Sequence, residues 1–164
     1  MGEVYRAVDG ELERPVAIKL LAAAYAAEPD LRQRFTREAL AAARLSAGPN
    51  TVTVYDVGEW QERPFLVMEY LAGGSLEQRL RRRGKPPTGQ ALAWLEQAGA
   101  ALDHAHANGV VHRDVKPANL LLDGEDALHV PTSASLRRPG WPRSPRPAPC
   151  LAAPATSHPN GQTA

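Results

Sequence analysis

The feature that most constrains this chain is a dense polar segment, residues 112–119, enclosed by two apolar runs. The segment holds a histidine, two basic residues, an aspartate and an asparagine, with Val110-Val111 before it and Leu120–Leu122 after it. Apolar runs of this kind predict buried backbone, which a plain solvated loop does not need. Buried segments that carry polar side chains to one point are how a rigid scaffold positions chemistry. We therefore expect a catalytic or binding site at residues 112–119.

The pattern of apolar residues predicts a sheet-rich first part and a mainly helical second part. Helices are expected over residues 30–45, just after Ser75, and from residue 88 to about residue 108. A hairpin turn is expected at Asp123-Gly124. The expected strands are residues 4–8, 15–21, 51–57, 64–70, 110–111, 119–122 and 127–130.

Polar residues mark the expected helix ends. Asp30 and Thr88 suit N-caps, and Ser75 with Gln78 matches a capping box. Asn108-Gly109 suits a left-handed C-cap. Four residues at helical spacing form the stripe of the last helix that we expect to face the core: Leu92, Leu95, Gly99 and Leu102.

Two charged residues do not fit an ordinary core. Glu38 falls in the middle of an apolar stripe of its helix, where a carboxylate is costly without a partner. Strand alternation places Lys19 on the same face as the small Ala17, among Val, Ile and Leu neighbours. Taken alone, either side chain could instead extend along the protein surface and place its charge in solvent. Taken together, we expect Lys19 and Glu38 to neutralise each other.

These segments resemble one family. His-Arg-Asp-x-Lys-Pro-x-Asn, followed by three aliphatic residues, resembles the catalytic loop of protein kinases. Val16–Lys19 resembles the third strand of the kinase N-lobe, Glu38 the glutamate of helix C, and Phe65–Leu76 the strand and hinge that hold adenine. The resemblance runs over residues 1–130 in the family's order. Lys116 matches the serine/threonine branch, and the style of the chain resembles bacterial members.

The resemblance implies a fold and an activity. The fold is α+β and protein-kinase-like: an antiparallel N-lobe sheet plus helix C over about residues 1–70, joined to the first part of a mainly helical C-lobe over about residues 71–130. The activity is ATP-dependent phosphorylation of Ser or Thr in a protein substrate, with ATP and Mg²⁺ as cofactors.

The resemblance also implies roles for single residues. Asp114 would accept the proton of the substrate hydroxyl, Lys116 would contact the γ-phosphate, and Asn119 would ligate Mg²⁺. Lys19 would hold the α- and β-phosphates, and Glu38 would orient Lys19. The remaining implied residues of the ATP site are Val4, Ala17, Met68, Glu69, Leu71 and Leu121, with Met68 at the gatekeeper position and Leu121 beneath adenine.

The chain departs from the family pattern in two places. Only Gly2 and Val4 match the end of the Gly-rich loop over the phosphates, so the first strand is expected to be missing. After Val130, where the family has Asp-Phe-Gly with its Mg²⁺ ligand, this chain has Pro131–Leu136. We therefore expect a chain truncated at both ends and inactive as it stands. The alternative is a non-catalytic, pseudokinase-like module that binds ATP or a partner.

Residues 131–164 differ in character from the rest. They hold eight prolines and four arginines without any Asp or Glu, so we expect a disordered tail. A genuine linker is one explanation. A reading-frame shift is the other, because one choice of synonymous codons for residues 131–136, read one base out of frame, encodes Thr-Asp-Phe-Gly-Leu-Ala.

The bulk properties exclude some classes of protein. The net charge of +1 gives no argument for binding nucleic acid or membranes. No apolar run approaches the roughly 20 residues that a membrane helix needs. The single cysteine, Cys150, has no internal disulfide partner. A cytoplasmic location is therefore expected.

Overall fold

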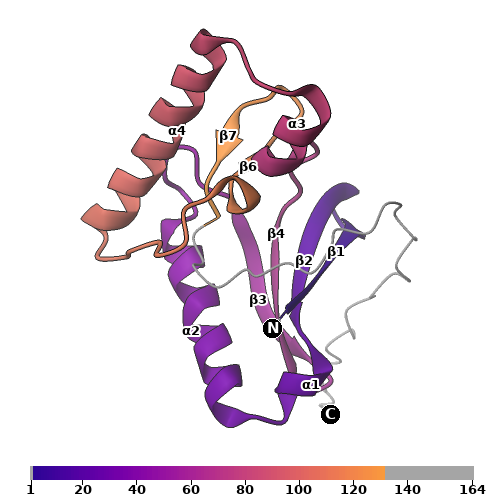
Figure 1. The fold of residues 1–164 in the computed structure, drawn as a ribbon. Helices are drawn as coiled ribbons and strands as arrows, with labels where there is room; N and C mark the ends of the chain where they lie inside the picture. Colours follow the sequence, from indigo (N-terminus) through magenta and orange to yellow (C-terminus); the bar gives the residue numbers. More distant parts are fainter. Residues whose placement is uncertain (1, 132–164) are drawn as a thin grey trace, which may run out of the picture.

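The computed structural model describes residues 2–131. The expected tail and the suggested reading-frame shift fall almost entirely on residues 132–164, outside the described part. Figure 1 shows a sheet with one long helix beside it at one end of the molecule, and shorter strands with two helices at the other end. Within the described residues, no helix has the length and apolar character needed to cross a bilayer.

The main sheet is antiparallel and has the order β1-β2-β4-β3. Its strands are β1 (Gly2–Asp9), β2 (Arg14–Leu21), β3 (Val54–Trp60) and β4 (Arg63–Glu69). Three of the four expected strands match within about two residues. The third begins at Val54 rather than at Thr51, because Thr51 forms a parallel bridge with Val130 in the other half of the molecule.

Two helices follow β2: the short α1 (Ala23–Ala26) and the long α2 (Pro29–Leu45). The N-cap of α2 is Glu28, with proline in the first helical position, so the expectation of an Asp30 cap was wrong. Proline suits the first turn because its missing N–H has no helical partner there. Asp30 instead lies within that turn, where a negative charge is favourable.

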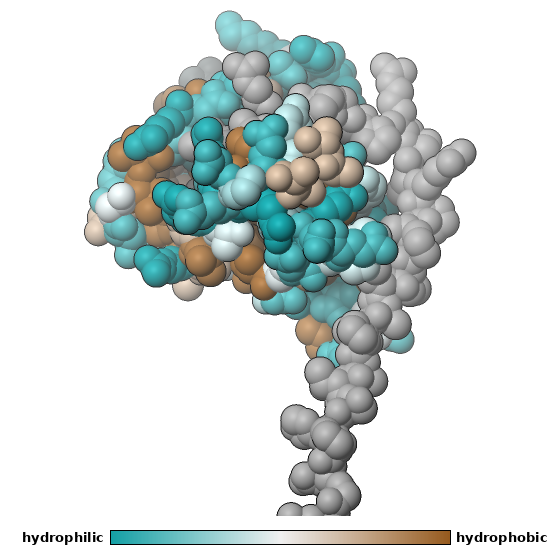
Figure 2. Space-filling model, turned by 90° about the horizontal axis from the view of Figure 1, so that it is seen from below, coloured by the Kyte–Doolittle hydropathy of each residue, from teal (hydrophilic) through white to brown (hydrophobic). Residues whose placement is uncertain are grey.

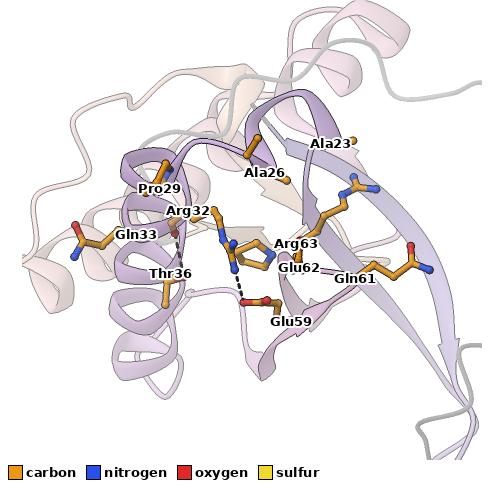
Figure 3. Close-up of a pocket in the computed structure, with 12 residues that line it drawn as sticks. Ala23, Ala26, Pro29, Arg32, Gln33, Thr36, Glu59, Gln61, Glu62 and Arg63 are labelled. Carbon is orange, nitrogen blue, oxygen red and sulfur yellow. Dashed lines mark hydrogen bonds and ion pairs between the residues drawn. The ribbon is translucent and has the colours of Figure 1, made fainter.

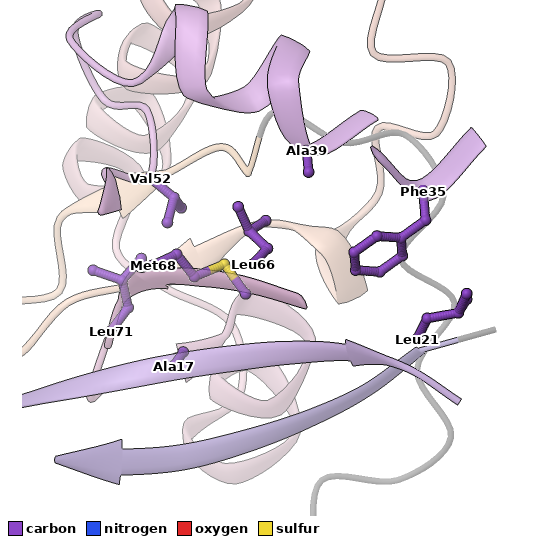
Figure 4. Close-up of a cluster of buried hydrophobic side chains, with 8 residues drawn as sticks. All are labelled: Ala17, Leu21, Phe35, Ala39, Val52, Leu66, Met68 and Leu71. Carbon is purple, nitrogen blue, oxygen red and sulfur yellow. The ribbon is translucent and has the colours of Figure 1, made fainter. Parts of the chain in front are cut away.

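One buried cluster joins the sheet to α2 (Figure 4). Two of its members, Ala17 and Ala39, are small, which lets the helix lie close to the sheet, over β3 and β4. Its buried members are Ala17, Leu21, Phe35, Ala39, Val52, Leu66, Met68 and Leu71. Burial of this set stabilises the position of α2 over the face of β2 that carries Lys19.

The second half contains a small sheet with the order β5-β6-β7. Its strands are β5 (Gly74–Ser75), β6 (Leu121–Leu122) and β7 (Leu128–His129), and its helices are α3 (Leu76–Arg83), α4 (Thr88–Ala107) and the 3₁₀ turn η1 (Pro117–Asn119). The strands expected over residues 119–122 and 127–130 are thus shorter than predicted, and residues 110–111 do not form a strand. Without a neighbouring backbone to pair with, an apolar pair alone does not make a strand.

The predicted caps in this half are partly confirmed. The Ser75 side chain accepts from the Gln78 backbone, and the Gln78 side chain accepts from the Ser75 backbone, which is the expected capping box. Gly109 has φ +73° after the last turn of α4, as expected for a left-handed C-cap. Thr88 is the first helical residue after Pro87 and makes no capping bond, so that expectation was wrong.

The expected core face of α4 was wrong in part. Leu102 packs against the buried cluster of this half, but Leu92 and Leu95 are 55% and 68% exposed, so they point away from the core. The buried positions are Trp94, Ala98, Ala101 and Ala105, also at helical spacing. The Trp94 indole donates to the Asp126 carbonyl at 2.8 Å, which fixes this face of the helix toward the β6–β7 hairpin. Small alanines then allow close packing against Leu122 and Leu128.

Backbone hydrogen bonds join the two halves. Val130 N–H donates to the Asn50 carbonyl at 2.7 Å, and Val52 N–H donates to the Val130 carbonyl at 3.4 Å. The Asn50 side chain donates to the Leu128 carbonyl at 3.1 Å. The polar segment 112–119 is therefore held by a hairpin that is bonded to the first half.

Seen from below, the surface around the main sheet mixes hydrophilic residues with smaller hydrophobic areas (Figure 2).

Candidate active site

Three predicted residues meet at the polar segment. Lys116 Nζ lies 2.7 Å from both carboxylate oxygens of Asp114. The amide nitrogen of Asn119 donates to the Asp114 carbonyl oxygen at 2.9 Å and to its Oδ2 at 2.8 Å. Arg113 adopts φ +62°, a left-handed conformation that turns the chain sharply just before Asp114. The result is a carboxylate fixed by two donors, half-exposed at the surface.

His112 supports this segment from within, a role that the sequence analysis did not assign. The ring is buried, and its Nε2 lies 3.0 Å from the Pro131 carbonyl oxygen. Burial lowers the pKa of His112, opposed by that hydrogen bond and by the charge of Asp114, so the ring is neutral at pH 7. Because a carbonyl only accepts, the neutral ring carries its proton on Nε2. The position of His112 as the first residue of the His-Arg-Asp motif was the sequence feature that could have indicated this supporting role.

Lys19 is a buried cation. It lies on β2 opposite Val4 of β1 and Leu66 of β4, and is only 5% exposed. Its Nζ lies 5.2 Å from the centre of the Phe35 ring. Burial lowers the pKa of Lys19 to about 8, and the negative charge of Glu38 opposes that shift. A lysine held this way is a functional-site candidate, because burial of an ammonium group is otherwise costly.

Glu38 lies within electrostatic range of Lys19 but makes no ion pair with it. Among the described residues, no ion pair within 4.0 Å joins the two, whereas Arg34 Nε lies 3.1 Å from Glu38 Oε1. Arg34 is one helical turn before Glu38, a spacing that favours this contact. The direct Lys19–Glu38 contact expected from the sequence is therefore not formed in this structure.

The residues predicted to surround adenine come together in the buried cluster. Ala17, Met68 and Leu71 are members of it, and Val4 and Leu121 pack against it from β1 and β6. Figure 4 shows Ala17 of β2 and Met68 of β4 close to Leu71, at the end of the cluster away from Phe35. Five side chains from four separate segments thus form one apolar surface.

The backbone after β4 offers a hydrogen-bond donor beside this surface. The N–H of Glu69 donates to the Thr53 carbonyl at 2.8 Å and is used within the protein. Within residues 2–131, the N–H of Leu71 has no such partner. An unused donor at the edge of an apolar surface suits a planar, nitrogen-containing ring.

The described residues offer little to a metal ion. They contain no group of three or more His, Cys, Asp or Glu side chains arranged to hold one. Asn119 uses its amide nitrogen on Asp114, so its Oδ1 is the atom left to ligate a hard cation. Mg²⁺ usually needs a carboxylate in addition, and Asp114 is already bound to Lys116. The donor set therefore fits Mg²⁺ only in part.

The surface has a hollow away from these residues. It has a volume of about 740 Å³ and lies between α1, the first turns of α2 and the β3–β4 turn (Figure 3). The Arg32–Glu59 ion pair at 3.0 Å bridges α2 and β3 there. None of the predicted site residues lines this hollow, so it is distinct from the candidate active site.

Most of the chain is similar to known proteins. Residues 1–130 match the family model described as "Protein kinase domain". The serine/threonine-protein kinase PknE of Mycobacterium bovis is 43% identical over 130 residues, which cover 79% of this chain and 23% of the relative. The serine/threonine-protein kinase PrkC of Bacillus subtilis is 43% identical over 123 residues, covering 75% of this chain and 19% of the relative.

A solved structure is similar as well. The crystal structure of a point mutant of the Mycobacterium tuberculosis PknI kinase domain superposes with a TM-score of 0.68 at 35% identity, covering 87% of this chain and 57% of that chain. The present chain thus spans about a fifth of the length of the curated relatives named above.

Proposed function

Because this chain belongs to the protein kinase family and is similar to its bacterial serine/threonine members, we propose that the protein it represents phosphorylates Ser or Thr of a protein substrate with ATP. The α+β fold is the protein kinase fold. We further propose that residues 1–70 are the N-lobe and residues 71–130 the start of the C-lobe. The observation that carries the proposal is the joint contact of Lys116 and Asn119 with Asp114.

Asp114 is the proposed acceptor of the substrate hydroxyl proton. Its carboxylate is half-exposed and fixed from two sides, as a positioned base must be. Phosphoryl transfer asks the protein mainly for positioning and charge stabilisation. Lys116 supplies a positive charge next to the same carboxylate, where the γ-phosphate would approach the hydroxyl oxygen.

The nucleotide is proposed to lie between Lys19 and the apolar surface. Ala17, Met68, Leu71, Val4 and Leu121 would hold adenine, with the backbone of Glu69 to Leu71 at its edge. Lys19, with a pKa of about 8, is mostly protonated at pH 7 and can hold phosphate oxygens. In this proposal Glu38 orients Lys19 after exchanging its contact with Arg34.

The chain carries few of the side chains that would ligate Mg²⁺. Asn119 would hold one Mg²⁺, which neutralises phosphate charge when bound. No Asp or Glu occurs in residues 131–164, so a second, carboxylate ligand at the usual place is lacking. We therefore propose that this chain binds ATP but transfers phosphate poorly or not at all. Use of ATP, together with the single cysteine, favours a cytoplasmic location.

The experiment separates binding from transfer on the full 164-residue chain. Binding is measured with a fluorescent ATP analogue, and transfer with radiolabelled ATP and Mg²⁺, using the chain itself and a general Ser/Thr substrate. We expect saturable binding that unlabelled ATP competes away, and no label on protein. Robust labelling that Asp114→Asn abolishes would refute the proposed inactivity while supporting the kinase assignment. A chain that binds no nucleotide would refute the proposed ATP binding and would leave the pseudokinase-like alternative only as a module that binds a partner.

A further inference from the structure

A second hollow lies between α3 and the turn that joins β6 to β7. Its volume is about 350 Å³. Figure 1 shows α3 beside this hairpin. Three arginines of α3 and two aspartates of the turn line it, together with small residues that leave it open: Arg79, Arg82, Arg83, Asp123, Asp126, Ala72, Gly73 and Gly124.

Positive charge is concentrated on this side of the molecule. Residues 76–85 hold four arginines and one lysine against a single acid, Glu77, whereas the whole chain has a net charge of only +1. Glu77 pairs with Arg81 at 3.2 Å. Arg82 and Lys85 are exposed, and neither forms an ion pair with any other described residue. The segment therefore carries cations that its own acids do not balance.

Arg79 makes the hollow more than a charged surface. Its side chain is only 13% exposed, and its Nε lies 3.5 Å from Asp126 Oδ2, at the limit of a hydrogen bond. Within residues 2–131, its Nη1 atom is buried and has no hydrogen-bond partner. A buried guanidinium nitrogen without an acceptor is costly. Because Arg79 lines the hollow, an anionic group there would stabilise this buried charge at short range without a direct contact to Nη1.

The two aspartates of the turn do not supply an acceptor for Arg79 Nη1, because they are engaged elsewhere. Asp123 Oδ1 accepts from the backbone of Glu125 and Ala127 at 2.8 and 2.9 Å, and its Oδ2 lies 3.3 Å from His129. Asp126 Oδ2 is shared between Arg79 and Arg83, at 3.5 and 3.4 Å. One oxygen serving two guanidinium groups leaves their other nitrogens for another anion.

The hollow is also connected to the candidate active site. The Leu76 N–H at the start of α3 donates to the Leu120 carbonyl at 2.8 Å, directly after Asn119. The Gly73 N–H donates to the Leu122 carbonyl at 2.9 Å. Helix α3 also packs against η1, the turn that ends at Asn119. A chain bound at α3 would therefore lie next to the segment that carries Asp114.

We propose that the hollow lined by Arg79, Arg82 and Arg83 docks an acidic segment of a protein substrate. Its Asp or Glu carboxylates would contact the exposed guanidinium groups of Arg82 and Arg83, next to the partly buried Arg79. Carboxylates suit guanidinium groups because the two geometries match. Residues 131–164 of this chain carry four arginines and no acid, so their charge does not suit the hollow. The inference deepens the proposed kinase function and rests on it.

The test measures binding without ATP, so it does not depend on phosphoryl transfer. A fluorescent peptide rich in Asp and Glu around one serine is titrated with the full 164-residue chain, and anisotropy is recorded. A matched peptide with Asn and Gln in place of the acids is the neutral probe. The variant is Arg82→Gln/Arg83→Gln, and the matched control is Arg37→Gln/Arg44→Gln, which removes the same charge from exposed positions of α2.

We expect the acidic peptide to bind and the neutral one not to bind. Binding to the Arg82/Arg83 variant should be weaker by about fivefold, as two partly exposed ion pairs allow, and binding to the α2 control unchanged. Arg79→Gln should weaken binding as well, with thermal unfolding checking that this more buried variant remains folded. Added salt should weaken the wild-type complex.

Three results would overturn the proposal. The first is no binding of the acidic peptide, or equal weakening in both double variants, which would mean general charge attraction. The second is displacement of the peptide by low concentrations of inorganic phosphate, which would point to a small anion. The third is tighter binding to phosphatidylserine vesicles that the Arg82/Arg83 variant loses, which would point to a membrane surface. Because nucleotide binding is measured separately, loss of the docking site leaves the kinase assignment standing.

Discussion

Lys116 Nζ lies 2.7 Å from both carboxylate oxygens of Asp114, two residues before it in the chain. The lysine and the proposed base therefore act as one unit. In the proposed site, the γ-phosphate would contact the positive charge of Lys116. Lys116 would thereby separate the phosphate from the negative charge of Asp114. Removal of Lys116 would leave two negative groups facing each other.

Lys116→Met should therefore weaken ATP binding much more than ADP binding. The γ-phosphate is the group that Lys116 would contact, and ADP lacks it. A charge-assisted hydrogen bond contributes about 1.5 kcal/mol or more, so we expect about a tenfold loss for ATP. Competition against a fluorescent nucleotide measures both affinities, and Lys85→Met, another exposed lysine, is the control. Equal losses for ATP and ADP would contradict the assigned role.

Lys19 should make folding stability depend on pH in an alkaline range. Its pKa is about 8 in the folded protein against a usual value of 10.5, so between these values the unfolded chain holds a proton that the folded chain has released. The free energy of unfolding then rises with pH from about 8 to about 10.5. Below pH 8 the buried charge destabilises the fold, by an amount on the order of 3 kcal/mol.

Lys19→Met removes this dependence. Compared with wild type, the variant should be more stable at pH 7, and the difference should shrink as the pH approaches 10. Urea unfolding at a series of pH values measures it. A difference that stays constant with pH would show that Lys19 titrates normally.

The same lysine should couple nucleotide binding to a proton. Phosphates placed against Lys19 favour its charged form and raise its pKa in the complex. Affinity for ATP should then be highest below pH 8 and fall as the pH rises through 8 in the wild type. In Lys19→Met, affinity should be at least about tenfold lower, since a charged hydrogen bond is lost, and it should no longer change across this range. A pH series of fluorescent-nucleotide titrations would show whether both hold.

Strand residues of the site were predictable because strand periodicity is strict. Alternation alone places Ala17 and Lys19 on one face of β2. Met68 and Leu71 were expected from the family resemblance, and the structure buries both in the same cluster as Ala17. The helix residues were less predictable. Glu38 is on the expected side of α2, but its partner depends on small rotations that decide between Lys19 and Arg34, and sequence spacing does not fix these.

The face of α4 was not predictable for a different reason. Two stripes at helical spacing run along this helix, one rich in leucine and the other made of Trp94 and three alanines. Hydrophobicity favours the leucine stripe, whereas the structure buries the other one, leaves Leu92 and Leu95 exposed and packs Leu102 of the leucine stripe against the core. The decision comes from the hydrogen bond of Trp94 to Asp126, on a hairpin 32 residues further along the chain. A pattern within one helix carries no information about that partner.

Substitutions on the two stripes of α4 should therefore differ sharply in effect. Trp94→Ala should lower the free energy of unfolding by about 3–5 kcal/mol, because it leaves a large cavity and removes the shorter of the two side-chain hydrogen bonds to the Asp126 carbonyl. Leu95→Gln, at a position that is 68% exposed, should change it by less than about 0.5 kcal/mol. Urea unfolding compares them directly. A comparable loss for Leu95→Gln would mean that another surface covers this stripe in solution.

Two glycines allow a test of how the halves of the molecule pack. A Cβ on Gly48 would lie 2.1 Å from Cδ2 of His104, a ring on α4, whereas a Cβ on Gly73 would lie 2.4 Å from the Asp123 carbonyl oxygen and 2.7 Å from that of Leu122. A side-chain ring can move, but backbone bonded in a hairpin cannot do so without losing hydrogen bonds. Gly48→Ala should thus cost about 1–2 kcal/mol and Gly73→Ala about 3 kcal/mol or more.

The rescue experiment distinguishes the two. In a His104→Ala background, Gly48→Ala should cost less than about 0.5 kcal/mol, since the obstructing ring is gone and the two effects are coupled. Gly73→Ala should cost the same in either background, because its obstruction is the β6–β7 backbone. Denaturant unfolding of wild type and all the single and double variants completes both cycles. If His104→Ala leaves the cost of Gly48→Ala unchanged, the loop before β3 does not pack against α4 as the structure has it.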